Sequence, residues 1–193
     1  MQWLFLIILI PYIYLLLKIY NNLTKIKPFQ QRSNPDIFVS VIVACHNEEK
    51  NLPQLLSDIS AQVLSPDLFE LIIVDDNSAD TTFKIASGFN GIKNLKVIRN
   101  AGIGKKKAVR AGVEACKGEL IITTDADCRF GISWLKTISS FYFENKSDMV
   151  ICPVDMQGGR GFFHRFQELE FLSLQVVTAG TAMAGEPVMC NGA

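Results

Sequence analysis

The sequence lacks paired cysteines, an excess of either charge and any repeated or low-complexity tract. Its five cysteines are odd in number, widely spaced and never in a CxxC pair, which argues against a disulfide framework or a zinc site and favours reduced thiols. Basic and acidic residues are equal at 19 each, so the net charge gives no reason to expect a nucleic acid as partner. A length of 193 residues suits one domain with a real core, and hardly two.

The one long hydrophobic run lies at the N-terminus, where residues 3–20 are apolar except for Lys18. As a helix this run would be roughly 27 Å long, close to the thickness of a bilayer core. A signal peptide or a buried core helix is the alternative, but a signal peptide carries its positive charge before the apolar run. The basic residues here gather at the other end: Lys18, Lys25, Lys27 and Arg32. We therefore expect a transmembrane anchor at 1–20, a linker at 21–37 and a cytoplasmic domain after it.

From residue 38 onward, short apolar runs rich in β-branched residues alternate with segments of helical periodicity. Five runs are expected to form strands: 38–45, 71–76, 95–100, 119–125 and 148–154. Five segments are expected to form helices: 48–62, 78–89, 105–116, 133–144 and 162–177. Glu48 and Glu49 suit the first turn of the first of these helices. The alternation indicates a mostly parallel α/β sheet flanked by helices over residues 38–193, with a loop from residue 178.

Three of the predicted strands end in polar residues, in the stretches ACHNEE, VDDNS and TTDAD. Ligands of parallel α/β sheets bind beyond the carboxyl ends of the strands, so we expect these ends to line one crevice. Asp125 and Asp127, two positions apart, can face one hard cation such as Mg²⁺ or Mn²⁺ together with substrate phosphates. The alternative is a simple turn in which Asp127 caps the next segment.

The other two strand ends carry candidate ligand residues. A carboxylate at Asp75 or Asp76 can accept a hydrogen bond from a nucleobase N–H or a ribose hydroxyl, or it can cap the following helix. We expect Asp80 to be the cap and Asp76 to be the ligand. His46 can stack on or hydrogen-bond a base, or serve a structural role.

The stretch NAGIGKKKAVRAG matches neither the GxGxxG fingerprint nor the P-loop pattern. Its glycines allow a tight turn into a helix that begins with Lys105, Lys106 and Lys107. Cations at a helix N-terminus oppose the helix dipole, which suggests that one of them meets phosphates. A solvated basic face is the alternative.

Taken in order, the segments VSVIVACHNEEKNL, ELIIVDDNSADTT, NAGIGKKKAVRAGVEACKGELIITTDADC and CNGA resemble glycosyltransferase family 2. These are inverting enzymes with the GT-A (Rossmann-like) fold that use nucleotide-activated sugars. The resemblance covers residues 38–193. It implies a nucleotide site from Ala44, His46, Glu48, Asp76 and Lys105. It also implies that Asp125 and Asp127 form a DxD-type site for a divalent metal, Mg²⁺ or Mn²⁺, and the diphosphate.

The resemblance implies transfer of a hexosyl group from a nucleotide-diphosphate sugar, such as a UDP-sugar, to a saccharide or lipid acceptor at a membrane. Such members build polysaccharides or glycolipids of the cell envelope. The family's acidic general base lies well after NGA, so we expect it beyond Ala193 and expect the chain to be incomplete at its C-terminus. Two alternatives remain: a non-catalytic, membrane-tethered nucleotide-binding fragment, and a sugar nucleotidyltransferase, although ACHNEE lacks the glycines of the latter's phosphate loop.

Overall fold

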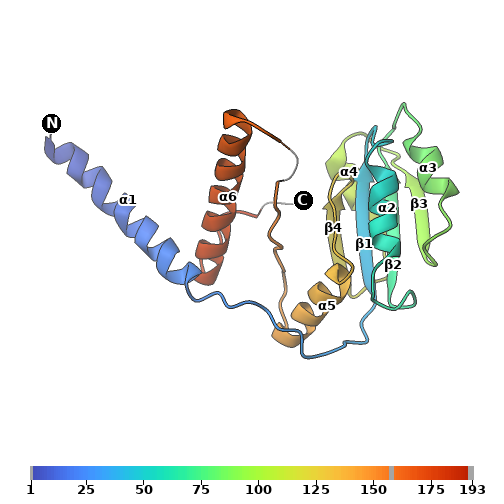
Figure 1. The fold of residues 1–193 in the computed structure, drawn as a ribbon, viewed down its shortest axis with the longest axis horizontal. Helices are drawn as coiled ribbons and strands as arrows, with labels where there is room; N and C mark the ends of the chain where they lie inside the picture. The colour runs from blue at the N-terminus through green and yellow to red at the C-terminus, as the bar shows by residue number, and fades with distance from the viewer. Residues whose placement is uncertain (1, 157–158, 191–193) are drawn as a thin grey trace. The chain divides into compact units, whose positions relative to one another are not determined.

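The computed structural model describes residues 2–156 and 159–190 (Figure 1). The chain divides into two compact units, which are treated separately below. We call the described parts of residues 1–30 and 151–191 the helical unit, and residues 31–150 the sheet unit.

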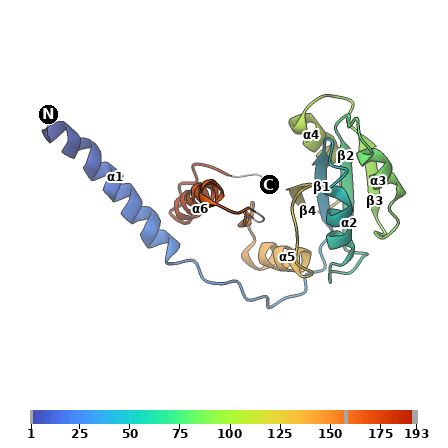
Figure 2. The same cartoon turned by 45° about the horizontal axis from the view of Figure 1, so that its top comes forward.

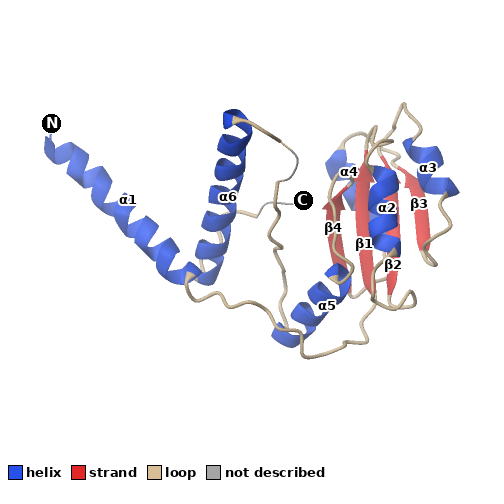
Figure 3. Ribbon diagram, viewed as in Figure 1, coloured by secondary structure: helices blue, strands red, loops and turns tan. Residues whose placement is uncertain are grey.

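The sheet unit is built on a four-stranded parallel sheet with the strand order β3-β2-β1-β4 (Figure 3). Its strands are β1 (Val39–Cys45), β2 (Phe69–Asp75), β3 (Leu95–Arg99) and β4 (Leu120–Asp125). The central strands β1 and β2 are buried almost throughout. Because helices cover both faces of a parallel sheet, these strands read as continuous apolar runs rather than as alternating ones.

Helices lie on both faces of the sheet (Figure 2). On one face, α2 (Leu52–Ser60), α3 (Thr82–Gly88) and α5 (Trp134–Asn145) contribute to one core with the alternate residues Val41, Val43 and Ile73. On the other face, α4 (Lys105–Ala115) packs on the residues between them, such as Ile42 and Val74. The chain therefore winds in one direction through β1, β2 and β3, and then crosses the other face to reach β4. The topological switch point lies between β1 and β4, which is where such folds bind ligands.

Two of the sequence predictions are wrong: the start of one helix and the existence of one strand. Helix α2 begins at Leu52 rather than at residue 48, so Glu48 and Glu49 precede it. The predicted strand 148–154 has no regular secondary structure. A strand needs a ladder partner, and the backbone N–H and C=O of Val154 are instead bonded to the side-chain amide of Gln175, at 2.8 Å and 2.6 Å.

The helical unit contains α1 (Gln2–Leu23) and α6 (Phe162–Met183). Helix α6 extends past residue 177, where we predicted a loop, because its small residues pack closely on α1. A Cβ atom at Gly180 would lie 2.6 Å from Cγ2 of Ile19 and 3.1 Å from its carbonyl oxygen. Beyond α6, an ion pair of 2.7 Å joins Glu186 to Lys18.

A transmembrane anchor was expected at residues 1–20, of which residues 2–20 fall within α1 and residue 1 lies outside the described residues. Across the part of the chain that the structure describes, no helix combines the length and the apolar character needed to cross a bilayer.

Candidate functional site

The strand ends meet at one edge of the sheet, as the sequence predicted. The parallel register places Cys45 beside Asp75 and Ala44 beside Asp125. Beyond the strands, the N–H of Asp76 donates to the carbonyl of Cys45 at 2.7 Å. Polar residues from β1, β2 and β4 therefore gather at the switch point. In folds of this type, ligands bind to groups just beyond the strand ends.

Asp76 holds the loop that leads into α4. Its side chain is 8% exposed. Oδ1 accepts a hydrogen bond from the Asn100 amide at 2.7 Å, and Oδ2 accepts one from the Gly104 N–H at 2.9 Å. Gly104 precedes α4 with φ of 98°, a conformation that favours glycine. The carboxylate thus lies at the positive end of the α4 dipole. Asp76 remains the predicted ligand for the nucleotide, and the structure gives it this second, loop-holding role.

Asp75 is the more unusual of the two adjacent aspartates. It is 3% exposed, and its Oδ1 has no hydrogen-bond partner among the described residues. An unpaired buried carboxylate oxygen is costly, and such groups often mark functional positions. Beside it, burial raises the pKa of the Cys45 thiol to about 12, and the charges of Glu48, Asp75 and Asp125 act in the same direction. Cys45 is therefore a protonated thiol at neutral pH.

His46 is exposed, but both of its ring nitrogens are engaged. Nδ1 lies 2.7 Å from the carbonyl oxygen of Asp76, and Nε2 lies 3.1 Å from the side-chain amide nitrogen of Asn47. Because a carbonyl only accepts and an amide NH₂ only donates, Nδ1 is the donor and Nε2 the acceptor in this network. Asn47, at φ of 57°, also accepts from the Ala79 N–H at 2.8 Å. The ring edges are thus occupied, which leaves the ring face for stacking.

Glu48 lies in the loop between β1 and α2, Asp80 lies in the loop between β2 and α3, and hydrogen bonds join the two loops. The Glu48 N–H donates to Oγ1 of Thr82 at 2.8 Å, and its carboxylate accepts from the Asn51 amide at 2.8 Å. Asp80 accepts from the N–H of Thr82, the first residue of α3, at 2.9 Å. Asp80 therefore accepts a hydrogen bond from the first turn of α3, although the N-cap position itself is Thr81 and not the predicted Asp80. Glu48 is half-buried beside the strand end, where it stays a predicted nucleotide contact.

The two aspartates of the DxD-type segment lie in a turn after β4. The N–H of Cys128 donates to the carbonyl of Asp125 at 3.3 Å, and Ala126 between the carboxylates is 3% exposed. The Lys105 ammonium, at the start of α4, lies 2.5 Å from Oδ1 of Asp125. Asp127 is exposed, and its side chain forms no hydrogen bond or ion pair within the described residues. The described contacts therefore do not support the alternative role of Asp127 as a cap on the next segment.

The donor set fits the divalent ion that the sequence predicts. In the described parts of the chain, no cluster of three or more His, Cys, Asp or Glu residues could hold a metal. The set at this edge is two carboxylates, Asp125 and Asp127. Mg²⁺ and Mn²⁺ suit such a set, because they commonly take one or two carboxylates together with substrate phosphates. Asp125 already pairs with the Lys105 ammonium through Oδ1, which shows that this position stabilises a positive charge, and a metal ion would compete with Lys105 for that oxygen.

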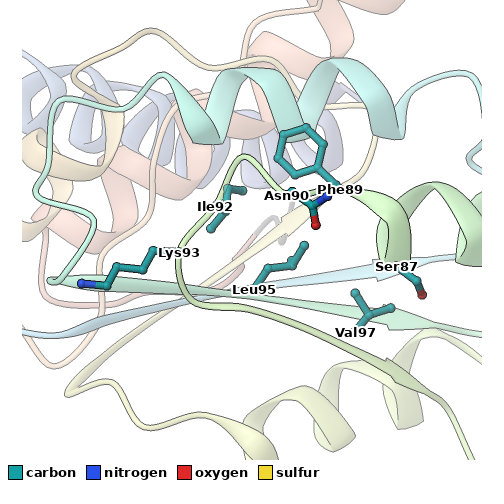
Figure 4. A pocket seen from close by; sticks show the side chains of 7 residues that line it. All are labelled: Ser87, Phe89, Asn90, Ile92, Lys93, Leu95 and Val97. Atoms are coloured by element: carbon teal, nitrogen blue, oxygen red, sulfur yellow. The ribbon is translucent and has the colours of Figure 1, made fainter.

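A separate hollow of about 570 Å³ lies between the end of α3 and β3 (Figure 4). Its lining residues are Ser87, Phe89, Asn90, Ile92, Lys93, Leu95 and Val97. The lining includes no carboxylate and no imidazole that could act on a substrate. The strand ends are therefore the better candidate site.

The family model for glycosyl transferase family 2 matches residues 40–187, which is most of the chain. The chain belongs to glycosyl transferase family 2. This match includes every predicted nucleotide and metal residue at the strand ends.

Curated relatives in this family are only partly covered by the chain. It is 41% identical over 101 residues to an undecaprenyl-phosphate 4-deoxy-4-formamido-L-arabinose transferase of Aeromonas hydrophila, covering 49% of this chain and 31% of that protein. It is 32% identical over 125 residues to the poly(ribitol-phosphate) β-N-acetylglucosaminyltransferase TarS of Staphylococcus aureus, covering 63% of this chain and 22% of TarS. The match therefore spans about a third or less of these relatives.

Solved glycosyltransferase structures share the fold. The crystal structure of S. aureus TarS 1–349 superposes with a TM-score of 0.58 at 30% identity, covering 65% of this chain and 38% of that one. The same TarS fragment has been solved with UDP and with UDP-GlcNAc. The mannosyltransferase PcManGT of Pyrobaculum calidifontis, solved with GDP-Man and Mn²⁺, has a TM-score of 0.57 at 23% identity, covering 66% of this chain and 39% of that one, and shows the fold alone. The GT-A type of α/β fold predicted from the sequence is confirmed.

Proposed function

We propose that the chain binds a nucleotide-diphosphate sugar at the strand ends and forms the donor site of an inverting, metal-assisted glycosyltransferase. The observation that carries this proposal is the meeting of three elements at the switch point. The loop held by Asp76 starts α4, the first residue of α4 is Lys105, and Lys105 reaches Asp125 at the end of β4. The proposed base-binding side and the proposed phosphate-binding side would therefore adjoin one another.

The nucleotide side would involve residues from β1 and β2. The free face of His46 suits stacking on a base, and Ala44, Glu48 and Asp76 lie at the same strand ends. The relative TarS, 30% identical over the matched region, has been solved with UDP and with UDP-GlcNAc, which supports a UDP-sugar as the donor. We expect the base to lie against β1 and the phosphates to lie toward α4.

The phosphate side would involve Lys105, Asp125 and Asp127. Asp125 and Asp127 would hold a divalent ion, and that ion, when bound, neutralises charge on the leaving diphosphate. Lys105 adds a second positive charge from a helix N-terminus whose N–H groups also favour anions. These residues bind and orient the donor.

In the proposed reaction, an acceptor hydroxyl attacks the anomeric carbon from the face opposite the diphosphate, which inverts its configuration. A general base takes the hydroxyl proton. We assign that base to none of the residues described above. A hexosyl donor, a saccharide or lipid acceptor, and a membrane location with the catalytic domain in the cytoplasm also stay predictions from the sequence.

The test is UDP binding to the full 193-residue chain, measured by calorimetry with and without Mn²⁺, in the wild type and in Asp127→Asn. We expect binding that Mn²⁺ strengthens in the wild type and that Mn²⁺ no longer affects in the variant. Because Asp127 is exposed and makes no described contact, its substitution should leave the melting temperature unchanged. Binding that ignores both Mn²⁺ and Asp127 would refute the metal site, and no UDP binding at all would refute the donor site.

A further inference from the structure

The segment that follows Asp127 is fastened to the end of α2. Arg129 donates to Asp58 through two nitrogens, Nε to Oδ2 at 2.7 Å and Nη2 to Oδ1 at 3.2 Å. The backbone N–H of Phe130 donates to the same Oδ2 at 3.2 Å. One carboxylate on α2 therefore binds both the side chain and the backbone of the segment.

A second set of contacts continues this attachment. The Gln62 side chain donates to the carbonyl of Gly131 at 2.9 Å and accepts from the N–H of Leu135 at 2.9 Å. The N–H of Val63 donates to the carbonyl of Ile132 at 2.9 Å. The segment from Arg129 to the start of α5 is thus fixed to the C-terminal end of α2.

The Asp58–Arg129 pair is not a loose surface pair. The Asp58 side chain is only 11% exposed, whereas that of Arg129 is 57% exposed. A bidentate arginine–carboxylate pair fixes geometry as well as charge. The hydrogen bond from Arg129 is the main cause that lowers the pKa of Asp58, so the carboxylate is charged throughout the neutral range.

The two predicted metal ligands differ in how they are supported. Asp125 is the last residue of β4 and is paired in register with Ala44. Asp127 lies beyond the ladder, and its side chain has no partner among the described residues. Two sets of contacts therefore hold the backbone near Asp127: the turn that begins at Asp125, and the contacts that the following residues make with α2.

We propose that Asp58 is a positioning residue for the metal and diphosphate site, which it serves by holding, through Arg129 and Phe130, the segment that carries Asp127. This inference rests on the proposed function. A ligand that must be ordered on binding loses affinity to the entropy of ordering, and groups behind metal ligands act by removing that cost. Asp58 itself touches no reacting group.

Loss of the Asp58 bonds should loosen the backbone at Arg129 and Phe130 without unfolding the sheet unit, because Gln62 and Val63 still hold the segment from residue 131 onward. Helix α2 is held to the sheet by Leu52, Leu55, Leu56 and Ile59, all of which are fully buried. None of these side chains depends on Asp58. The effect of an Asp58 substitution should therefore fall on the metal requirement more than on the fold.

The test compares Asp58→Asn, Arg129→Gln and the double variant in the full chain. Asp67→Asn is a matched control, because Asp67 forms an exposed ion pair with Lys93 elsewhere in the sheet unit. Two quantities are measured for each protein: the Mn²⁺ concentration that half-saturates metal-dependent UDP binding, and the affinity for UDP without metal. Thermal unfolding shows that each variant is folded.

We expect Asp58→Asn to need roughly tenfold more Mn²⁺, the usual scale for a group behind a metal ligand. Its metal-free UDP affinity should be unchanged, the double variant should be no worse than the worse single variant, and Asp67→Asn should match the wild type. A folded Asp58→Asn that needs no more Mn²⁺ would overturn the inference, as would an equal loss of metal-free affinity. If the wild type itself shows no metal-dependent binding, the proposed function fails and the inference fails with it.

Discussion

Replacing Lys105 by methionine should change metal binding and nucleotide binding in opposite directions. Its ammonium lies 2.5 Å from Asp125, with the two side chains 61% and 34% exposed. An ion pair this open to solvent contributes about 0.2–1 kcal/mol to stability, so the variant should lose no more than a few degrees of melting temperature. The fold should therefore not obscure the effect on binding.

The expected effect on the nucleotide is larger. A hydrogen bond from an ammonium to a phosphate oxygen contributes about 1.5–3 kcal/mol. Its loss in Lys105→Met should weaken UDP binding roughly ten- to a hundredfold. Affinity for Mn²⁺ in the absence of UDP should instead rise, because the ammonium no longer competes for Oδ1 of Asp125. The opposite signs distinguish this role from general damage to the site.

Calorimetry with UDP and electron paramagnetic resonance of free Mn²⁺ measure the two affinities separately. Lys106→Met is the control, because Lys106 is a neighbouring exposed lysine that forms no ion pair in the described part of the chain. Equal weakening of UDP binding by both substitutions would show that the lysines act only as a general basic surface and that Lys105 has no specific role. A fall in Mn²⁺ affinity for Lys105→Met would refute the competition at Asp125.

Two further predictions concern stability. Gly112→Ala should lower the free energy of unfolding by about 1–3 kcal/mol in urea titrations, because its Cβ would lie 2.4 Å from Cγ2 of Ile42; an unchanged unfolding midpoint would show that α4 can move away from the sheet. The lowered pKa of Asp58, caused first by its hydrogen bond from Arg129, means that its contribution is present above the unfolded pKa of about 3.9 and is lost as pH falls through the folded value. When the pH is lowered from about 5 to 2, the free energy of unfolding should therefore fall less for Asp58→Asn than for the wild type. Parallel curves of unfolding free energy against pH for the two proteins would contradict this.

The sheet could be predicted because its signals are local. Strands β1 and β2 are buried on both faces, so residues 41–45 and 71–74 appear as unbroken apolar runs in the sequence. Their polar ends were predictable for the same reason, since parallel strands bring their carboxyl ends to one edge. The sequence therefore places Asp76 and Asp125 at one edge without any knowledge of the structure.

The failures come from contacts between residues distant in sequence. The predicted strand 148–154 contains the right residue types, but Gln175 binds the backbone of Val154 in place of a neighbouring strand. Helix α6 continues through residues that suit a loop because Gly180 packs against Ile19. Neither contact can be predicted from the local sequence pattern.

The candidate site shows the same division. The spacing of Asp125 and Asp127 predicts a metal site, but nothing near them in sequence indicates Asp58, which lies 71 residues from Arg129. The roles of Asn100 and Gly104 as donors to Asp76 could have been sought in NAGIG, where a glycine before a helix often permits a positive φ. The orphan oxygen of Asp75 depends on burial and could be found only in the folded chain.

The most direct test of the donor site is a crystal structure of this chain with UDP and Mn²⁺. We predict the metal at Asp125 and Asp127, the base against His46, and Lys105 moved from Asp125 to a phosphate. UDP bound elsewhere, for example in the hollow beside Phe89, with Lys105 still paired to Asp125, would contradict the account.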